Sequence, residues 1–226
     1  MSHQERRQRR MAQILDGAAH VFARKGFHAA TTREIAQAAD VSEGTIYNYF
    51  DSKEDLLIHI MTQLTAGEHH VTGLHAVDRP DAVGEGAPDA VEQTLSTDMR
   101  DFLENVLRVR QAFVAENGPM LRAVVSEILI DRDFAQRYYQ QLLAPTLELL
   151  ELHLRARIEK GDIRPVDVPL FARYFLATNL GLLELLFLDD PVLKSTWGSD
   201  QLVEALSSFL LDGLQPNDEG KARGDA

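Results

Sequence analysis

The sequence predicts an all-α protein. Gly and Pro residues divide the 226-residue chain into long segments whose apolar residues recur with a helical period, and no segment alternates like a β-strand. Hydrophobic residues make up 45% and charged residues 26%, an ordinary composition for a folded globular chain. The absence of cysteine excludes disulfides and thiolate metal sites and fits a reducing cytoplasm. The length allows one large domain or two unequal ones.

The first predicted helix covers residues 6–25. Its apolar side repeats at i, i+3, i+4 and i+7 and consists of Leu15, Ala18, Ala19 and Phe22. Gly26 is suited to a left-handed C-cap, so the helix is expected to end there. Phe27 then follows as a core residue.

Two short helices and a longer one are predicted next. Thr31 and Glu34 have the Thr-x-x-Glu spacing of a capping box, which predicts a helix over 32–39. Ser42 is placed to cap a second short helix over 43–49, and Asp40 lies in the turn between them, where Asp tolerates a left-handed conformation better than most residues. Residues 51–55 then predict a new helix that runs through Leu64.

The remainder of the chain predicts longer helices around a loop. Residues 71–88 are rich in Gly, Asp, Pro and Ala and are expected to form a mobile loop. Helices are predicted over 89–116, 119–130, 132–159, 167–188 and 199–212, with separators at 118–119, 161–165 and 191–198. Pro145 should kink the third of them. The polar residues 215–226 are expected to form a disordered tail.

The charge is distributed unevenly along the chain. The formal net charge is -12, yet residues 1–60 contain eight Lys/Arg and eight Asp/Glu, so the acidic excess belongs to residues 61–226. Four of those eight basic residues are Arg6, Arg7, Arg9 and Arg10. An electropositive face is therefore compatible with the acidic total, and these arginines are either a solvated face or an arm that touches an adjacent groove or phosphate of DNA.

Two short helices joined by a tight turn have the layout of a helix-turn-helix unit. The stretches GFHAATTREIA (26–36), VSEGTIYNYF (41–50) and SKEDLL (52–57) resemble the N-terminal domain of the TetR family of bacterial transcriptional regulators. The resemblance covers about residues 10–60, and beyond it only the helical layout and residues 161–165 are similar to the family. It implies a DNA-binding domain over 1–56, an effector-binding and dimerisation domain over 57–214, and a tail over 215–226.

The side-chain chemistry divides the predicted DNA contacts into two groups. Hydroxyl and ammonium donors suit phosphate oxygens and set the register; these are Thr32, Ser42, Tyr47, Tyr49 and Lys53. Groups suited to base edges, or to close approach, are Arg33, Glu43, Gly44, Thr45 and Asn48. The two tyrosines could instead be packed aromatics.

The resemblance also implies a two-fold dimer and a small-molecule effector. The dimer interface is expected on the last two long helices at Phe171, Phe175, Leu182, Leu186, Leu202, Leu206, Phe209 and Leu210. Candidates for an apolar effector pocket are Phe102, Val106, Phe113, Met120, Val124, Ser126, Glu127, Tyr138 and Leu142, although plain core packing explains each of them as well. Two subunits would read a pseudo-palindromic operator in double-stranded DNA.

Other classes of protein remain as alternatives. An all-α enzyme or carrier with a vestigial head is one, but no phosphate loop, nucleophile motif, metal site or cofactor motif is present. An activator or an effector-independent DNA binder is another. The apolar stretch 168–188 reaches the length of a membrane span but contains Arg173, Asn179 and Glu184, so we expect no membrane partner and a cytoplasmic protein.

Overall fold

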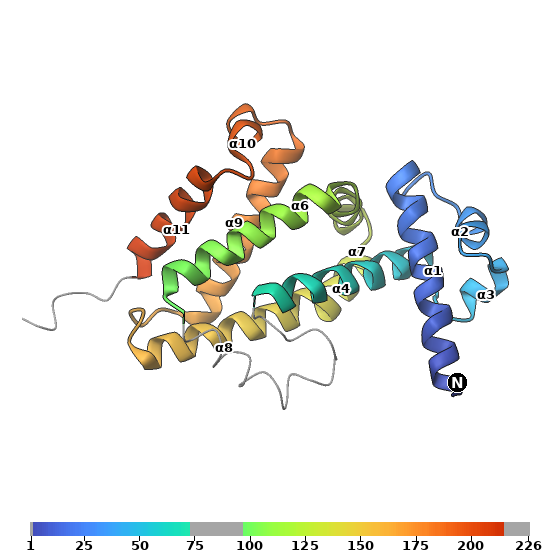
Figure 1. The fold of residues 1–226 in the computed structure, drawn as a ribbon, viewed down its shortest axis with the longest axis horizontal. Coiled ribbons are helices and arrows are strands. Elements are labelled where there is room, and N and C mark those ends of the chain that lie inside the picture. Colours follow the sequence, from blue (N-terminus) through green and yellow to red (C-terminus); the bar gives the residue numbers. More distant parts are fainter. Residues whose placement is uncertain (1, 73–96, 215–226) are drawn as a thin grey trace, which may run out of the picture. The chain divides into compact units, whose positions relative to one another are not determined.

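The computed structural model describes residues 2–72 and 97–214, and this part of the chain is helical and free of strands, as predicted (Figure 1). The predicted tail and most of the predicted 71–88 loop lie outside the described residues; Val71 and Thr72 end a helix. By compactness the chain divides into a first unit, Met1–Thr65 with Glu116–Leu142, and a second unit, Ala66–Ala115 with Leu143–Ala226. The functional boundary at residue 56 stays a prediction.

The first unit begins with three helices in the predicted order. They are α1 (His3–Lys25), α2 (Thr32–Ala38) and α3 (Glu43–Tyr47). Their buried side chains are those that the helical period selects and include Leu15, Phe22, Phe27, Ile35 and Ile46. The rings of Phe22 and Phe27 meet edge to face, 5.1 Å apart, and thereby hold the loop after α1 against the helix.

Local hydrogen bonds define the ends of these helices. The predicted capping box is confirmed: Glu34 N–H donates to Thr31 Oγ1, and Thr31 N–H donates to Glu34 Oε2. Ser42 Oγ accepts from Thr45 N–H at 3.1 Å and so starts α3 as predicted. Gly26 ends α1, but its φ of 81° and ψ of 156° lie outside the left-handed helical cap that we expected. This extended conformation at positive φ is open to glycine alone.

Helices α1 and α2 approach each other closely at Gly17. A Cβ atom added to Gly17 would lie 2.8 Å from Ala39 Cβ and 2.9 Å from Ala39 N. The second of these neighbours is backbone, which cannot rotate away. The absence of a side chain at residue 17 therefore sets the separation of α1 from the end of α2.

The first unit also includes the start of α4 (Lys53–Thr72), the C-terminal part of α6 (Met99–Ile130), α7 (Arg132–Tyr138) and the π-helical turn η1 (Tyr139–Leu143). Leu56, Leu57, Ile58 and Met61 on α4 are fully buried. Asp131 caps α7 by accepting from two backbone N–H groups. The predicted start of the 89–116 helix lies mostly outside the described residues.

One prediction about prolines needs correction. Pro119 lies inside α6, so Gly118 and Pro119 do not separate two helices. The φ angle of proline is compatible with a helix, and Gly118 has no Cβ that would clash with the proline ring. The helix can therefore continue on both sides of Pro119, although one backbone hydrogen bond is lost. The predicted 132–159 helix consists of three consecutive segments, α7, η1 and α8 (Ala144–Lys160). Pro145 lies in the first turn of α8, where its missing N–H is tolerated, and the kink expected there stays a prediction.

The second unit combines the N-terminal part of α6 with α8, α9 (Val168–Phe187), α10 (Pro191–Thr196) and α11 (Asp200–Leu214). Helix α8 packs on α9, and α9 contacts α10. The core includes Met99, Leu103, Leu154, Ala172 and Leu214. Helix α10 lies in the stretch 191–198, which we had predicted as a separator; Asp190 caps it and Pro191 occupies its first turn.

A cation is buried in the second unit. The Arg157 side chain is inaccessible to solvent and donates to the Thr97 carbonyl at 2.8 Å and to Asp162 Oδ2 at 2.7 Å. His153 stacks on Phe102 with ring centroids 4.0 Å apart. Burial, aided by the charge of Arg157, lowers the pKa of His153 to about 4. His153 is therefore neutral at pH 7 and accepts a hydrogen bond from Arg157 Nε.

Helix α9 is apolar but poorly buried within the protomer. Of its 20 residues only Val168, Ala172 and Leu183 are buried, while Leu170 and Tyr174 are 66% and 59% exposed. Among the described helices it alone has the length and composition of a membrane span, which is weak support for a span because helices of soluble proteins satisfy the same criteria. Its Arg173 pairs with Glu151 at 2.9 Å.

Candidate nucleic-acid interface

The turn between α2 and α3 fixes the pose of the second helix. Asp40 has a φ of 50°, the left-handed conformation predicted for it, and Val41 N–H donates to the Ala36 carbonyl at 2.9 Å. Ile46 and Phe50 are buried with 1% exposure each. One side of α3 is thus anchored in the core, and the other side is presented to solvent.

The solvent side carries the side chains predicted to read bases. Glu43, Gly44 and Asn48 are exposed, as is Arg33 on α2, whereas Thr45 is half-buried. Tyr47, which was predicted to contact phosphate, is 55% exposed. Within the described ranges, neither the Arg33 guanidinium nor the Asn48 amide has a hydrogen-bond or ion-pair partner. A guanidinium and an amide that are exposed and uncommitted can make bidentate contacts with guanine and adenine.

Several predicted DNA contacts bond to one another across the turn. Thr32 Oγ1 donates to Glu43 Oε2 at 3.3 Å, and the Tyr47 hydroxyl lies 3.5 Å from Thr32 Oγ1. Ser42 Oγ and Thr45 Oγ1 are 2.8 Å apart. The start of α2 and the exposed side of α3 therefore form one polar surface.

Lys53 has a different environment from the one expected for a phosphate contact. Its ammonium donates to the carbonyls of Phe27 at 2.9 Å, Ala30 at 3.3 Å and His28 at 3.4 Å. It also lies 4.4 Å from the centroid of the Phe27 ring. Lys53 holds the loop between α1 and α2 in place, and a phosphate would have to compete with these carbonyls.

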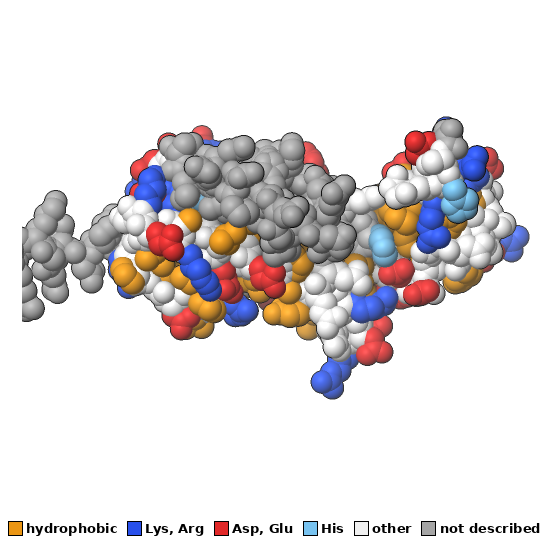
Figure 2. Space-filling model, turned by 90° about the horizontal axis from the view of Figure 1, so that it is seen from below, with side chains coloured by type: hydrophobic (Ala, Val, Ile, Leu, Met, Phe, Trp, Pro, Cys, Tyr) orange, Lys and Arg blue, Asp and Glu red, His pale blue; other side chains and the backbone are white. Residues whose placement is uncertain are grey.

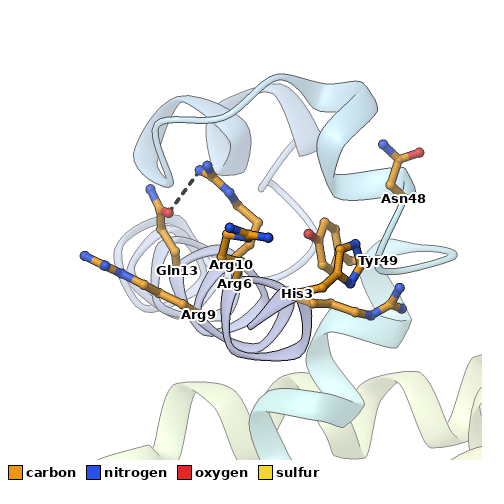
Figure 3. Close-up of a pocket in the computed structure, with 8 residues that line it drawn as sticks. His3, Arg6, Arg9, Arg10, Gln13, Asn48 and Tyr49 are labelled. Carbon is orange, nitrogen blue, oxygen red and sulfur yellow. Dashed lines mark hydrogen bonds between the residues drawn. The ribbon is translucent and has the colours of Figure 1, made fainter. Parts of the chain in front are cut away.

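A basic groove of about 750 Å³ runs beside the recognition surface (Figure 3). It is lined by His3, Arg6, Arg7, Arg9, Arg10 and Gln13 of α1 and by Asn48 and Tyr49. The Arg7 guanidinium lies 5.3 Å from the centroid of the Tyr49 ring. Figure 2 likewise shows basic side chains, coloured blue, on the first unit. Sequence reasoning proposed the arginines and Tyr49 separately, and the structure brings them together.

Two histidines of the first unit interact with carboxylates. His28, in the loop after α1, lies 3.2 Å from Glu127 Oε1 and 3.2 Å from Ser126 Oγ of α6. His59 Nδ1 lies 3.4 Å from Asp55 Oδ1, and this interaction lowers the pKa of the Asp55 carboxyl and raises the pKa of His59. Sequence reasoning missed both histidines. The contacts of His28 join distant segments and leave no local pattern, whereas the i, i+4 spacing of Asp55 and His59 on one helix is a signal that could have found that pair.

The effector-pocket candidates are divided between the two units. Phe102, Val106 and Phe113 belong to the second unit, and the other candidates, Met120, Val124, Ser126, Glu127, Tyr138 and Leu142, belong to the first. All are buried except Val106 and Ser126, which are half-buried. Phe102 is part of the second unit's core, and Glu127 is engaged by His28. Their role as an effector site stays a prediction.

The dimer candidates lie together in the second unit. An apolar groove of about 380 Å³ is lined by six of them, Phe171, Phe175, Leu182, Leu206, Phe209 and Leu210, together with Leu107, Tyr174, Thr178 and Asn179. Phe209 is 78% exposed. Leu186 and Leu202 are half-buried. The groove is a surface of α6, α9 and α11.

A helix of exposed polar groups, held at a fixed angle by a tight turn and a buried apolar side, defines a helix-turn-helix DNA-binding protein. Residues 14–60 match the family model of the bacterial regulatory proteins of the tetR family. This part of the chain is therefore similar to the DNA-binding domain of that family of transcriptional regulators.

Relatives support this assignment over different lengths. The chain is 25% identical over 225 residues to the HTH-type transcriptional regulator YfiR of Bacillus subtilis, covering 95% of this chain and 97% of the relative. It is 45% identical over 51 residues to the fatty acid metabolism regulator protein of the same species, covering 23% and 26%. The fold is similar to that of B. subtilis FadR in complex with stearoyl-CoA, at a TM-score of 0.61 and 21% identity, covering 89% and 95%.

Proposed function

We propose that the protein is a dimeric repressor that binds a pseudo-palindromic operator through α2 and α3 and is released by a small apolar effector. One observation carries the proposal. The side chains of Arg33 and Asn48 are exposed and have no partner in the described part of the chain. Arg33 lies on α2 and Asn48 directly follows α3, and both helices are capped and anchored by buried apolar residues. Arg33, Glu43, Gly44, Thr45 and Asn48 approach base edges. Thr32, Ser42, Tyr47 and Tyr49 bind phosphates, with Lys53 contributing only where it leaves its carbonyl partners.

The proposed dimer forms through α9 and α11. Support comes from α9, which is apolar nearly all round yet leaves Leu170, Tyr174 and Leu185 exposed in the protomer. On α11, Phe209 projects from the apolar groove. A two-fold dimer separates its recognition helices by about 34 to 36 Å, one turn of B-DNA, which matches a pseudo-palindrome.

The proposed effector carries a long acyl chain. The fold is similar to that of a regulator in complex with stearoyl-CoA, and the head is similar to that of a fatty acid metabolism regulator. The candidate pocket residues are aromatic, aliphatic or Met, apart from Ser126 and Glu127. The effector must bind the DNA-incompetent state more tightly, and DNA must weaken effector binding by the same factor. The regulator acts in the cytoplasm, where its operator is.

The test begins with selection of duplexes by the purified protein from a random library. A pseudo-palindrome bound with steep salt dependence is expected, because each neutralised phosphate releases a counterion. Asn48→Ala should relax base choice at particular positions, whereas the exposed Arg132→Ala, on α7, should leave it unchanged. Enrichment of no sequence would refute the operator proposal.

The effector is tested on the selected duplex with stearoyl-CoA, and free coenzyme A serves as the control. Stearoyl-CoA should release the protein from DNA at concentrations that leave non-specific binding unchanged. Equal release by both compounds, or release by neither, would refute an acyl-chain effector.

A further inference from the structure

The first two turns of α1 concentrate positive charge where a helix tolerates it least. Arg6, Arg7, Arg9 and Arg10 include three like-charged pairs at i, i+3 or i+4, each of which destabilises a helix by about 0.2 to 0.5 kcal/mol. They also lie near the positive end of the helix macrodipole. None of the four has a carboxylate partner among residues 2–72 and 97–214. This arrangement costs stability, and a bound anion would offset that cost.

Two of these arginines are held in position by the protein. Arg7 stacks over Tyr49 at 5.3 Å. Arg10 Nη1 donates to Gln13 Oε1 at 3.1 Å, and Gln13 Nε2 donates in turn to the Ala39 carbonyl at 2.6 Å (Figure 3). Arg10 is thereby tied through Gln13 to the end of α2. Such tethering reduces the side-chain entropy that binding an anion would otherwise cost.

The position of the groove identifies the anion. Asn48, which directly follows α3, lines the same groove as Arg6, Arg7 and Arg10. When α3 enters the major groove, a cationic channel that continues from its end meets the sugar-phosphate backbone beside the bases being read. A channel with four guanidinium groups suits a run of phosphates better than a single one.

We propose that this groove binds the operator's phosphate backbone on the outer side of the half-site read by α3. The proposal rests on the operator binding proposed above. It adds a second contact surface that contributes affinity and lengthens the protected DNA, without contributing base choice. Arg7 and Arg10 are the main contacts, because they are the two that the protein orients.

The experiment compares two protein variants on two duplexes. Arg7→Gln/Arg10→Gln removes two charges from the groove, and Arg24→Gln/Arg132→Gln removes two exposed charges elsewhere in the first unit. The long duplex carries flanking base pairs on both sides of the selected sequence, and the short duplex ends at its edge. Dissociation constants are measured for wild type and both variants over a range of salt concentrations.

The groove variant should lower the salt slope by about 1.8 per protomer, at about 0.9 for each lost phosphate contact. Trimming the duplex should weaken wild-type binding at least about 10-fold and the groove variant less than about 2-fold, because the contact is already lost. The selected sequence should stay the same, and thermal unfolding should be unchanged or raised by relief of repulsion. The control variant should lose affinity on trimming as wild type does.

The proposal would be overturned if the groove variant kept the salt slope of wild type. It would also be overturned if trimming the duplex weakened binding of the groove variant as much as binding of the control variant. Saturable binding of inorganic tripolyphosphate, abolished by Arg7→Gln/Arg10→Gln while trimming has no effect, would assign the groove to a free polyphosphate instead. If selection enriches no sequence, the operator proposal fails separately. The groove is then tested by binding to a duplex of random sequence, and the salt slope of the groove variant must still be lower than that of wild type.

Discussion

Replacing Lys53 with Met separates a structural role from a DNA-binding role. Methionine keeps an unbranched apolar stem against Phe27 but removes the ammonium that donates to the carbonyls of Phe27, His28 and Ala30. Those carbonyls belong to the loop that leads from α1 into α2. Their loss of a donor should lower the stability of the whole head.

The structure sets the size of the effect. Hydrogen bonds to a charged group contribute about 1.5 to 3 kcal/mol, and an accessible cation–π contact about 0.5 to 1 kcal/mol. Lys53 is half-buried and two of its three bonds are long, so we expect the lower end of both ranges, about 2 kcal/mol in total. For a chain of this length that corresponds to a fall in Tm of about 4 to 8 °C.

Urea unfolding of wild type and Lys53→Met at one protein concentration measures this loss, and the salt slope of operator binding is recorded on the same samples. Arg24→Gln is the matched control, because it removes an exposed charge of the first unit that lies outside the proposed DNA contacts and has no partner in the described part of the chain. An unchanged unfolding midpoint together with a salt slope lowered by about one would refute the structural role. Lys53 would then be a phosphate contact.

Three further outcomes are expected. Acidification from pH 6.5 toward pH 4 should lower the free energy of unfolding by up to about 1.4 kcal/mol per pH unit. The reason is that the pKa of His153 is lowered in the folded state, so the unfolded chain takes up the proton first. Urea unfolding of His153→Gln should depend less on pH. Phe209→Glu should raise the dimer dissociation constant at least about 100-fold in sedimentation, and an unchanged constant would exclude α11 from the interface. Thr31→Ala should cost about 1 kcal/mol in urea unfolding, whereas equal stability would mean that the capping box contributes nothing.

Local signals in the sequence predicted the head well. The capping box at Thr31 and Glu34, the cap at Ser42 and the left-handed Asp40 each depend on groups within four residues of one another. Such interactions can be predicted from sequence because both partners lie within one short segment. The all-α class followed for the same reason.

Predictions failed where packing overrides a local signal. Pro119 was read as a boundary, yet the turns on either side of it keep α6 continuous. Residues 191–198 were read as a separator because they contain Pro and Gly, whereas Pro191 starts α10. Proline marks either the end or the first turn of a helix, and tertiary contacts decide between the two.

The roles of the predicted site residues stay predictions, and the sequence anticipated only part of their geometry. Exposure of Arg33 and Asn48 agrees with roles assigned from chemistry alone. The engagement of Lys53 by carbonyls at residues 27–30, and the stacking of Arg7 on Tyr49, join segments 23 to 42 residues apart. No periodicity records contacts at that separation, so only coordinates could supply them.

The close approach at Gly17 fixes the position of α2 independently of the residues of α3 that are proposed to read bases. Because backbone meets Ala39 there, the position of α2 does not depend on a side-chain rotamer that neighbouring substitutions could shift. The residues that face solvent on α3 can then be exchanged for those of another regulator while the frame stays constant. The helix-turn-helix domain is accordingly a suitable scaffold for transplanted specificity, provided that residue 17 stays glycine.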